Sequence, residues 1–124
     1  MNQKFSIIKQ LKSFSFALNG LKILFKEEHN ARIQLVAAFL VILMGVYFNI
    51  NSFEWVIVVL SIGFVFVSEL LNSSIEAVCD FIQPEKHQAI KRIKDLAAGA
   101  VLFSAITALV VACIIFSPKI IALF

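Results

Sequence analysis

Long apolar runs dominate the chain and predict helices that cross a membrane. One run of 21 residues without a charge follows Arg32, and another run of 23 such residues follows Asp95. A helix of about 20 apolar residues spans the roughly 30 Å hydrocarbon core of a bilayer. We therefore predict transmembrane helices at about residues 33–52 and 94–118.

A third apolar run lies between these two and leads into polar residues. Residues 55–68 carry no charge, but this stretch of 14 residues is too short to span a bilayer as a helix. Beyond it, polar side chains recur at positions i, i+3, i+4, i+7 and i+11, which places them on one stripe of a continuing helix. These side chains are Glu69, Asn72, Ser73, Glu76 and Asp80. A third transmembrane helix, at about residues 54–82, must therefore carry carboxylates.

The N-terminal part of the chain predicts an amphipathic helix on the membrane surface, over residues 1–31. Apolar residues recur at helical spacing between Phe14 and Phe25, while the lysines fall mainly on other faces. Each lysine near anionic headgroups contributes about 1 kcal/mol to membrane binding. A charged helix in solvent is the alternative interpretation.

Short polar segments separate the predicted spans. Asn49, Asn51 and Ser52 form a turn-like cluster after the first span. Pro84 cannot lie inside a helix, and it opens a charged segment that extends to Asp95. We expect a short turn at the first position, and a loop that leads into a polar helix start at the second.

Composition and charge agree with a single membrane domain. Of the 124 residues, 60% are hydrophobic, and the mean hydropathy of +0.94 lies far outside the range of soluble proteins. Lysine and arginine number six in residues 1–32, none between the first two spans and four between the last two. This distribution predicts that the N-terminus and the second loop face the cytoplasm. The net charge of +3 therefore favours topology and lipid contact over binding of nucleic acid.

The depth of Glu69 predicts a functional site. Counted from Phe53 at about 1.5 Å per residue, Glu69 lies roughly 24 Å into the bilayer, near the inner boundary of the hydrocarbon. A carboxylate at this depth is energetically costly and is a functional hypothesis in itself. The alternative is a cytoplasmic extension of the helix whose acidic side chains face water.

Two further polar groups are predicted at the same membrane level. The group before the first span consists of Glu27, Glu28, His29, Asn30 and Arg32. The group before the last span consists of Lys91, Lys94 and Asp95. Small residues at 98–100 follow the second group and favour close helix approach.

These groups contain the parts that phosphoryl transfer requires. Magnesium is usually held by one or two carboxylates together with phosphate oxygens, and Glu28 and Glu76 could supply that pair. Lys94 could contact the phosphates, and Glu69 could orient or deprotonate an attacking hydroxyl. However, the chain has no glycine-rich nucleotide pattern, and intramembrane carboxylates with a lysine fit a cation or proton pathway equally well.

The order of the motifs resembles the prokaryotic diacylglycerol kinase family. The segment that carries most of the resemblance is Glu69-Leu-Leu-Asn72-Ser73-Ser-Ile-Glu76-Ala77-Val78. It is accompanied by Glu28-His-Asn30-Ala-Arg32, Pro84-Glu85-Lys-His87 and Lys94-Asp95-Leu-Ala-Ala98-Gly99. The resemblance thus spans nearly the whole chain.

The resemblance implies a lipid kinase that uses ATP and Mg²⁺, and an all-α integral membrane fold. It also implies a homotrimer in the bacterial inner membrane, with active sites shared between neighbouring subunits on the cytoplasmic side. Glu69 is implied as the proton acceptor for the lipid hydroxyl, and Asn72 as a polar support of the reaction centre. Glu28 and Glu76 are implied as metal ligands. The implied contacts of ATP are Glu28, Glu76, Glu85, Lys86, His87, Lys94 and Asp95. The implied contacts of the lipid are Asn30, Arg32, Glu69 and Ala98.

The acceptor that the resemblance implies first is diacylglycerol, which gives phosphatidic acid, and the alternative is undecaprenol. Lys9 and Phe16 stand where the Gram-negative pattern has an arginine and a tyrosine, so neither is included in the site. The forms Glu28-His-Asn30, Pro84-Glu85 and Ala97-Ala98-Gly99 are similar to the Gram-positive branch, which phosphorylates undecaprenol. A small cation or proton transporter and a membrane scaffold without activity are the alternatives from other classes.

Overall fold

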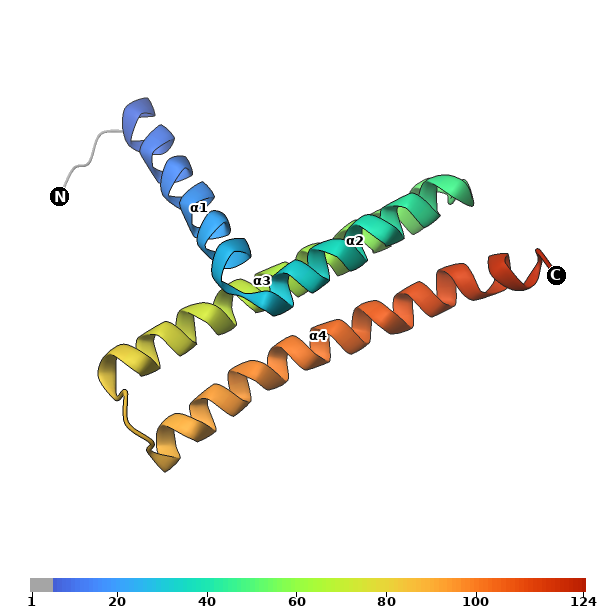
Figure 1. Ribbon diagram of the computed structural model, residues 1–124. Coiled ribbons are helices and arrows are strands. Elements are labelled where there is room, and N and C mark those ends of the chain that lie inside the picture. The colour runs from blue at the N-terminus through green and yellow to red at the C-terminus, as the bar shows by residue number, and fades with distance from the viewer. Residues whose placement is uncertain (1–5) are drawn as a thin grey trace.

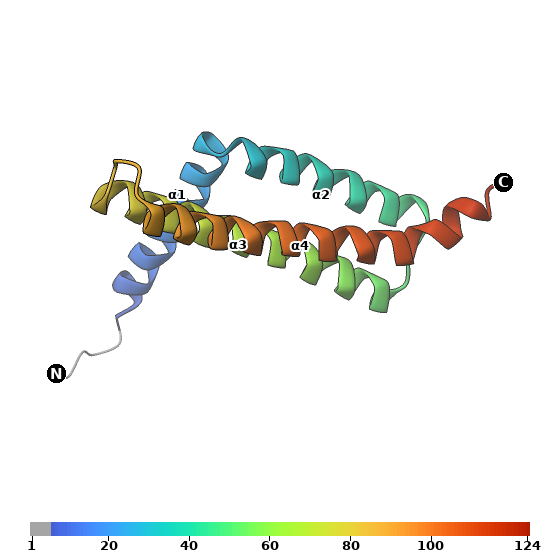
Figure 2. The same cartoon turned by 90° about the horizontal axis from the view of Figure 1, so that it is seen from below.

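The computed structural model describes residues 6–124, which form four helices. They are α1 (Ile7–Glu27), α2 (His29–Tyr47), α3 (Ser52–Ile82) and α4 (Gln88–Ile121). The helices α2, α3 and α4 form an elongated bundle, and α1 projects from its side (Figure 1). Helix α1 and the α3–α4 loop lie at one end of the bundle, whereas the α2–α3 turn and the C-terminus lie at the other (Figure 2).

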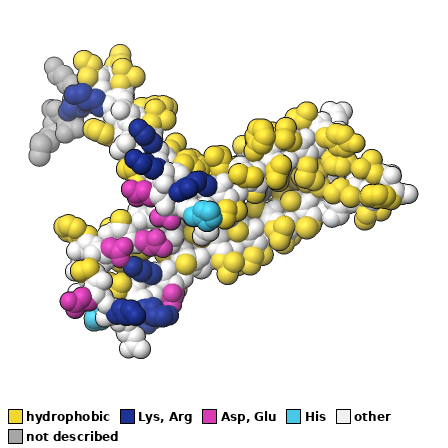
Figure 3. Space-filling view, viewed as in Figure 1, with side chains coloured by type: hydrophobic (Ala, Val, Ile, Leu, Met, Phe, Trp, Pro, Cys, Tyr) yellow, Lys and Arg dark blue, Asp and Glu magenta, His cyan; other side chains and the backbone are white. Residues whose placement is uncertain are grey.

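Three of the helices have the length and composition of membrane spans. The mean hydropathy of the most apolar window is 1.7 in α2, 2.1 in α3 and 2.6 in α4. Their outward faces carry large apolar side chains, and the charged side chains gather at the end that holds α1 and the α3–α4 loop (Figure 3). The predicted all-α architecture with three apolar helices able to span a membrane is therefore confirmed, and the chain is a membrane protein.

Helices α3 and α4 form an antiparallel pair with the most extensive packing in the chain. On α4, small side chains form much of the buried seam, because Ala97 and Ser104 are buried on the face toward the bundle. The small residues at 98–100, which were expected to mediate close helix approach, are exposed in this chain. The helical period explains the difference, since it turns Ala97 inward and the next three residues outward.

The α2–α3 turn is fixed by local hydrogen bonds and by a close contact. The side chain of Asn51 accepts a hydrogen bond from the backbone N–H of Glu54 at 2.9 Å, and the Glu54 carboxylate accepts one from the N–H of Asn51 at 3.2 Å. This reciprocal capping box satisfies two N–H groups at the start of α3. A Cβ atom at Gly45 would lie 2.7 Å from the Trp55 ring, so only glycine allows the two helices to approach this closely.

The same end of the bundle holds the main apolar cluster and an ion pair. Ile50, Val58, Ile115 and Phe116 are buried there against side chains of α2, α3 and α4. Nearby, Lys119 Nζ donates to Glu54 Oε2 at 2.7 Å and joins the end of α4 to the beginning of α3. The α2–α3 turn is therefore well anchored, and from it the antiparallel helices α2 and α3 extend side by side toward the charged end of the bundle.

Helix α1 is separate from α2, although the sequence predicted one amphipathic stretch over residues 1–31. Glu28 has an extended backbone conformation, with φ −100° and ψ 113°, and it ends α1 and precedes α2. The guanidinium of Arg32 donates to the carbonyl of Lys26 at 2.9 Å and so satisfies an acceptor in the last turn of α1. Residues 1–5 of the predicted helix lie outside the described residues.

The C-terminal end of α1 docks on α3. Leu24 is buried, and the Phe25 ring packs edge-on against Phe66 of α3 with ring centroids 5.6 Å apart. By contrast, the apolar side chains of the N-terminal half of α1, such as Phe14 and Phe16, are exposed. An amphipathic helix with one free apolar face is suited to lie on a membrane surface.

We predict that Gly45→Ala destabilises the α2–α3 turn, because its Cβ would collide with the Trp55 ring. Overpacking of this kind typically costs about 1–3 kcal/mol. Thermal unfolding in detergent micelles should show a lowered midpoint for this variant. The matched control is Gly63→Ala in α3, where a Cβ meets nothing within 4 Å. Equal midpoints for the two variants would contradict the prediction.

Candidate functional site

Glu69 is a buried carboxylate in the membrane-spanning helix α3. Only 2% of the residue is exposed, and it is the only Asp, Glu, His, Lys or Arg in the buried set of residues 6–124. Its Oε1 atom has no hydrogen-bond partner among the described residues. Burial of a charge-bearing group without a partner is costly, which indicates a function and not a packing role.

Two more side-chain atoms share this condition, within one helical turn of Glu69. Asn72 Oδ1 and Ser73 Oγ are buried and have no partner within residues 6–124. The other end of the Asn72 amide is used, since Nδ2 donates to Glu76 Oε1 at 3.3 Å. The predicted polar stripe is therefore a real face of α3, and its hydrogen-bonding capacity is only partly used within the chain.

The lengths of α2 and α3 bring Glu28 to the level of Glu69. Helix α2 has 19 residues, so its N-terminus lies about 28 Å from the α2–α3 turn. The same distance along the antiparallel α3 reaches the region of Glu69. The α1–α2 junction, which carries Glu28, therefore meets α3 at this depth, and the carboxylates of Glu28 and Glu76 both act electrostatically on Glu69.

A cavity of about 370 Å³ lies between α1 and α3, and we refer to it as the carboxylate cavity. Its polar lining consists of Glu27, Glu28, Ser73, Ser74, Glu76 and Asp80. Four of these six side chains are carboxylates, so the cavity is strongly acidic. Carboxylate oxygens are the ligands that hard cations such as Mg²⁺ prefer.

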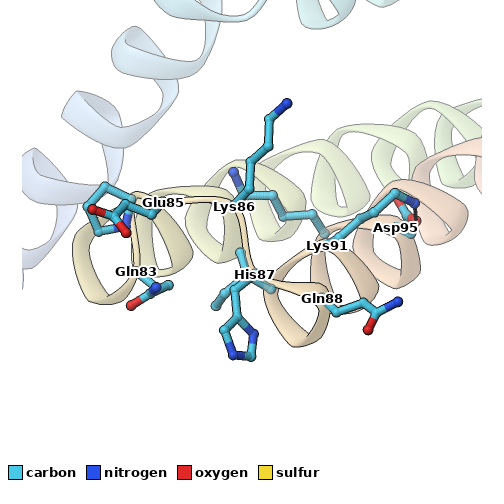
Figure 4. A pocket seen from close by; sticks show the side chains of 10 residues that line it. Gln83, Glu85, Lys86, His87, Gln88, Lys91 and Asp95 are labelled. Atoms are coloured by element: carbon cyan, nitrogen blue, oxygen red, sulfur yellow. Dashed lines mark hydrogen bonds and ion pairs between the residues drawn. The ribbon is translucent and has the colours of Figure 1, made fainter.

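A second cavity, of about 560 Å³, lies at the α3–α4 connection and is called the loop pocket. It is lined by residues 83–88 together with Ile90, Lys91, Lys94 and Asp95. His87 caps α4, since its Nδ1 atom accepts from the N–H of Ala89 at 3.1 Å. In Figure 4, His87 and Gln88 project to the same side, while Lys91 and Asp95 lie together further along α4. Five residues implied as ATP contacts line this pocket: Glu85, Lys86, His87, Lys94 and Asp95.

An ion pair connects the two cavities. Lys94 Nζ, in the loop pocket, donates to Asp80 Oδ1, in the carboxylate cavity, at 2.6 Å. Lys91 Nζ pairs in the same way with Asp95 Oδ2 at 2.6 Å, one turn along α4. The first two turns of α4 therefore hold cationic groups next to the acidic cavity, which is the charge arrangement that a metal-bound polyphosphate needs.

Five predicted site residues line neither cavity, namely Glu69, Asn72, Asn30, Arg32 and Ala98. Asn30 and Ala98 are exposed, and Arg32 is engaged with the backbone of α1. Within this single chain, the residues implied as lipid contacts are therefore not brought together.

The structure also places residues in the cavities that the sequence-based site did not include. Asp80 and Ser73 belong to the predicted polar stripe, but neither was assigned a role, and Glu27 was only a neighbour of Glu28. Their position on the same helical faces as Glu76 and Glu28 was the available signal. The partner of Lys94, 14 residues away across the loop, had no signal in the local spacing.

Comparison with known proteins identifies the family. Residues 15–116 match the sequence profile described as prokaryotic diacylglycerol kinase. The chain belongs to the prokaryotic diacylglycerol kinase family. As a member of this family, the chain is a lipid kinase, which is a phosphotransferase. Membership of a kinase family implies that ATP is the phosphate donor.

The relatives of this chain carry two different names. The chain is 37% identical over 108 residues to the undecaprenol kinase of Bacillus subtilis, covering 87% of this chain and 88% of the relative. It is 31% identical over 105 residues to the diacylglycerol kinase of Escherichia coli, covering 85% and 86%. A diacylglycerol kinase of Helicobacter pylori is 34% identical over 95 residues, covering 77% and 74%.

Proposed function

We propose that the chain transfers the γ-phosphoryl group of ATP to the hydroxyl of a membrane lipid, with Glu69 as the proton acceptor. The observation that carries this proposal is the buried carboxylate of Glu69, whose Oε1 has no partner among the described residues. Its helix neighbours Leu70 and Ser73 line the acidic cavity. A lipid hydroxyl is the kind of donor that the Oε1 oxygen can pair with. The membrane depth of Glu69 matches that of a headgroup.

The reaction needs little covalent chemistry from the protein. The lipid oxygen forms a bond to the γ-phosphorus, the bond to the β–γ bridging oxygen breaks, and ADP leaves with that electron pair. The hydroxyl proton passes to the carboxylate of Glu69. Positioning and charge stabilisation supply most of the catalysis in phosphoryl transfer.

Glu28 and Glu76 are the proposed ligands of Mg²⁺. Both line the carboxylate cavity, and a pair of carboxylates is the usual protein share of a magnesium site that also holds phosphate oxygens and water. Within residues 6–124, no three His, Cys, Asp or Glu side chains converge as a metal site. When bound, Mg²⁺ would offset the negative charge of the phosphate groups. Asn72, which donates to Glu76, supports this carboxylate.

The loop pocket is the proposed site of the nucleotide. Its five implied ATP contacts, Glu85 to His87 together with Lys94 and Asp95, provide both cationic groups and acceptors. Lys94 is placed between this pocket and the acidic cavity. Glu28 and Glu76 would contact ATP through the metal. We further propose that Asn30, Arg32 and Ala98 face the lipid.

A cation or proton transporter is less well supported. A transport pathway is expected to place ionisable groups near the bilayer midplane. In this chain, the charged side chains gather at one end of the bundle (Figure 3), apart from the Glu54–Lys119 pair at the other end. The same asymmetry supports an orientation in the bacterial inner membrane with the N-terminus and the site on the cytoplasmic side.

We predict that Glu69→Gln lowers kcat for lipid phosphorylation by at least about 100-fold, because general base catalysis typically contributes a factor of 10²–10⁴. The measurement is ATP-dependent phosphorylation of lipid in mixed micelles with Mg²⁺. The matched control is Glu54→Gln at the opposite end of α3, where the amide oxygen can still accept the capping hydrogen bond. Retained phosphorylation by Glu69→Gln would rule out the proposed base.

For the acceptor, we propose undecaprenol before diacylglycerol. Identity to the undecaprenol kinase is 37%, compared with 31% for the diacylglycerol kinase of Escherichia coli at nearly equal coverage. The segments around Glu28, Pro84 and Ala98 also resemble the branch that acts on undecaprenol. Both alcohols present a hydroxyl at headgroup depth, so the same base serves either one.

The acceptor is decided by a direct comparison. The purified protein is given ATP, Mg²⁺ and either undecaprenol or diacylglycerol as the sole acceptor in micelles. We predict at least about a 10-fold higher kcat/KM for undecaprenol, which corresponds to about 1.4 kcal/mol of discrimination. A preference for diacylglycerol would reverse the assignment, and no turnover with either lipid would overturn the lipid kinase proposal for this chain.

A homotrimer with shared active sites is also proposed. In this single chain, large apolar faces of α2, α3 and α4 are exposed, and three polar atoms near Glu69 have no partner within residues 6–124. Polar groups at membrane depth are normally covered by protein, which neighbouring subunits would provide. The exposed positions of Asn30 and Ala98 are consistent with contacts that cross between subunits.

We predict that the protein has the mass of three subunits in mild detergent, measured by light scattering with the detergent contribution subtracted. Phosphorylation should be lost when dilution in harsher detergent separates the subunits, because the polar face of α3 would then be uncovered. Full activity of a monomeric species would contradict the proposal.

A further inference from the structure

Four serines inside α3 fall into two groups, according to whether the side-chain hydroxyl makes a hydrogen bond within residues 6–124. Ser61, Ser68 and Ser74 each donate to the carbonyl four residues earlier, at distances of 2.9, 3.0 and 2.9 Å. This local bond is the usual way for a serine inside a helix to satisfy its hydroxyl. Ser73 differs, because its Oγ is buried and makes no hydrogen bond within residues 6–124.

Leaving this hydroxyl without a partner has an energetic cost. A buried polar group that loses its hydrogen bond is destabilised by about 1–3 kcal/mol. The carbonyl of Glu69, four residues before Ser73, occupies the position that the other serines use. The hydroxyl of Ser73 is therefore available to a ligand, and bonding to one would recover this cost.

Ser73 lies between Glu69 and Glu76 on α3, the residues proposed to serve the lipid hydroxyl and the nucleotide. It follows Glu69 by four residues and precedes Glu76 by three, so all three side chains share one face of α3. Its side chain lines the carboxylate cavity together with Glu28 and Glu76. A phosphoryl group transferred between the levels of Glu76 and Glu69 would pass close to Ser73.

The cavity needs a hydrogen-bond donor at that place. Its charged lining groups are all carboxylates, which would repel a phosphate. Among the other polar side chains that line it, Ser74 is committed to the carbonyl of Leu70. The nearby cation of Lys94 is paired with Asp80. Ser73 thus provides the uncommitted neutral donor of the lining.

We propose that the Ser73 hydroxyl donates a hydrogen bond to a non-bridging oxygen of the phosphoryl group in transfer. This inference rests on the proposed lipid kinase reaction and adds a catalytic residue to it. A donor aimed at oxygens that gain charge in the transition state stabilises that state more than the ground state. Its removal should therefore lower kcat more than it raises KM.

The test compares Ser73→Ala and Ser73→Cys, which remove the hydroxyl, with Ser73→Thr, which keeps it. We expect kcat to fall by about 100-fold in the first two variants, as for loss of one oxyanion-hole donor, with each KM within about 3-fold of the wild-type value. The Thr variant should retain at least about a third of the wild-type kcat. The matched control is Ser61→Ala, which removes a hydroxyl that is bonded within α3 and lines neither cavity, with kcat within about 2-fold.

A binding measurement separates this role from a structural one. Affinity for a non-hydrolysable ATP analogue with Mg²⁺, and the thermal midpoint in detergent, should be unchanged in Ser73→Ala. Ser73→Cys keeps the side-chain volume, so a loss of kcat in a folded Cys variant supports the proposal even where the Ala variant is unstable.

Three results would overturn the inference. Unchanged kcat in a folded Ala or Cys variant shows that the hydroxyl does not act in transfer. A higher KM for ATP with normal kcat assigns Ser73 to ground-state binding. Absence of phosphorylation by the wild-type protein with both lipids removes the underlying function, and this result is recognisable before any variant is compared.

Discussion

The unequal lengths of two antiparallel helices determine where the polar chemistry of this protein lies. Helices α2 and α3 start from one rigid turn, which is held by the contact between Gly45 and Trp55 and by the capping box at Asn51. Helix α2 ends after 19 residues, whereas α3 continues for 31. The α1–α2 junction therefore meets α3 at the depth of Glu69. A turn more or less in α2 would move Glu28 by about 5.4 Å along α3.

This geometry answers the physical problem of phosphorylating a lipid. The alcohol cannot leave the membrane and ATP cannot enter the hydrocarbon, so the reacting groups must meet at the headgroup level. The parts of α3 and α4 that extend beyond the start of α2 provide a polar platform at that level. On it, the carboxylate cavity and the loop pocket lie next to each other, joined by the Lys94–Asp80 pair. Family membership establishes that the protein is a lipid kinase, and the residues proposed for metal and nucleotide binding lie on this platform.

The sequence predicted the features that depend on local periodicity. The apolar runs predicted the helices able to span a membrane, and the spacing from Glu69 to Asp80 predicted one polar face on α3. Features that depend on contacts between helices were not predictable in this way. The break at Glu28 is accompanied by docking of α1 through Phe25 onto Phe66, 41 positions away in the sequence. The inward position of Ala97, in place of residues 98–100, depends on how α4 is rotated against α3. Ser73 and Ser74 are neighbours in the sequence, and only the three-dimensional structure shows that the Ser74 hydroxyl is hydrogen-bonded whereas the Ser73 hydroxyl has no partner within residues 6–124.

The most direct test of this account changes the length of α2. Insertion of four alanines after Ala38 adds slightly more than one turn, keeps the helical faces nearly aligned and moves the α1–α2 junction by about 6 Å. The control is the same insertion after Leu11 in the exposed N-terminal half of α1. The account predicts that the α2 variant is folded in detergent but loses at least about 100-fold of its lipid phosphorylation, whereas the α1 variant keeps most of it. Wild-type activity in the folded α2 variant would show that the level of Glu28 relative to Glu69 does not determine the site.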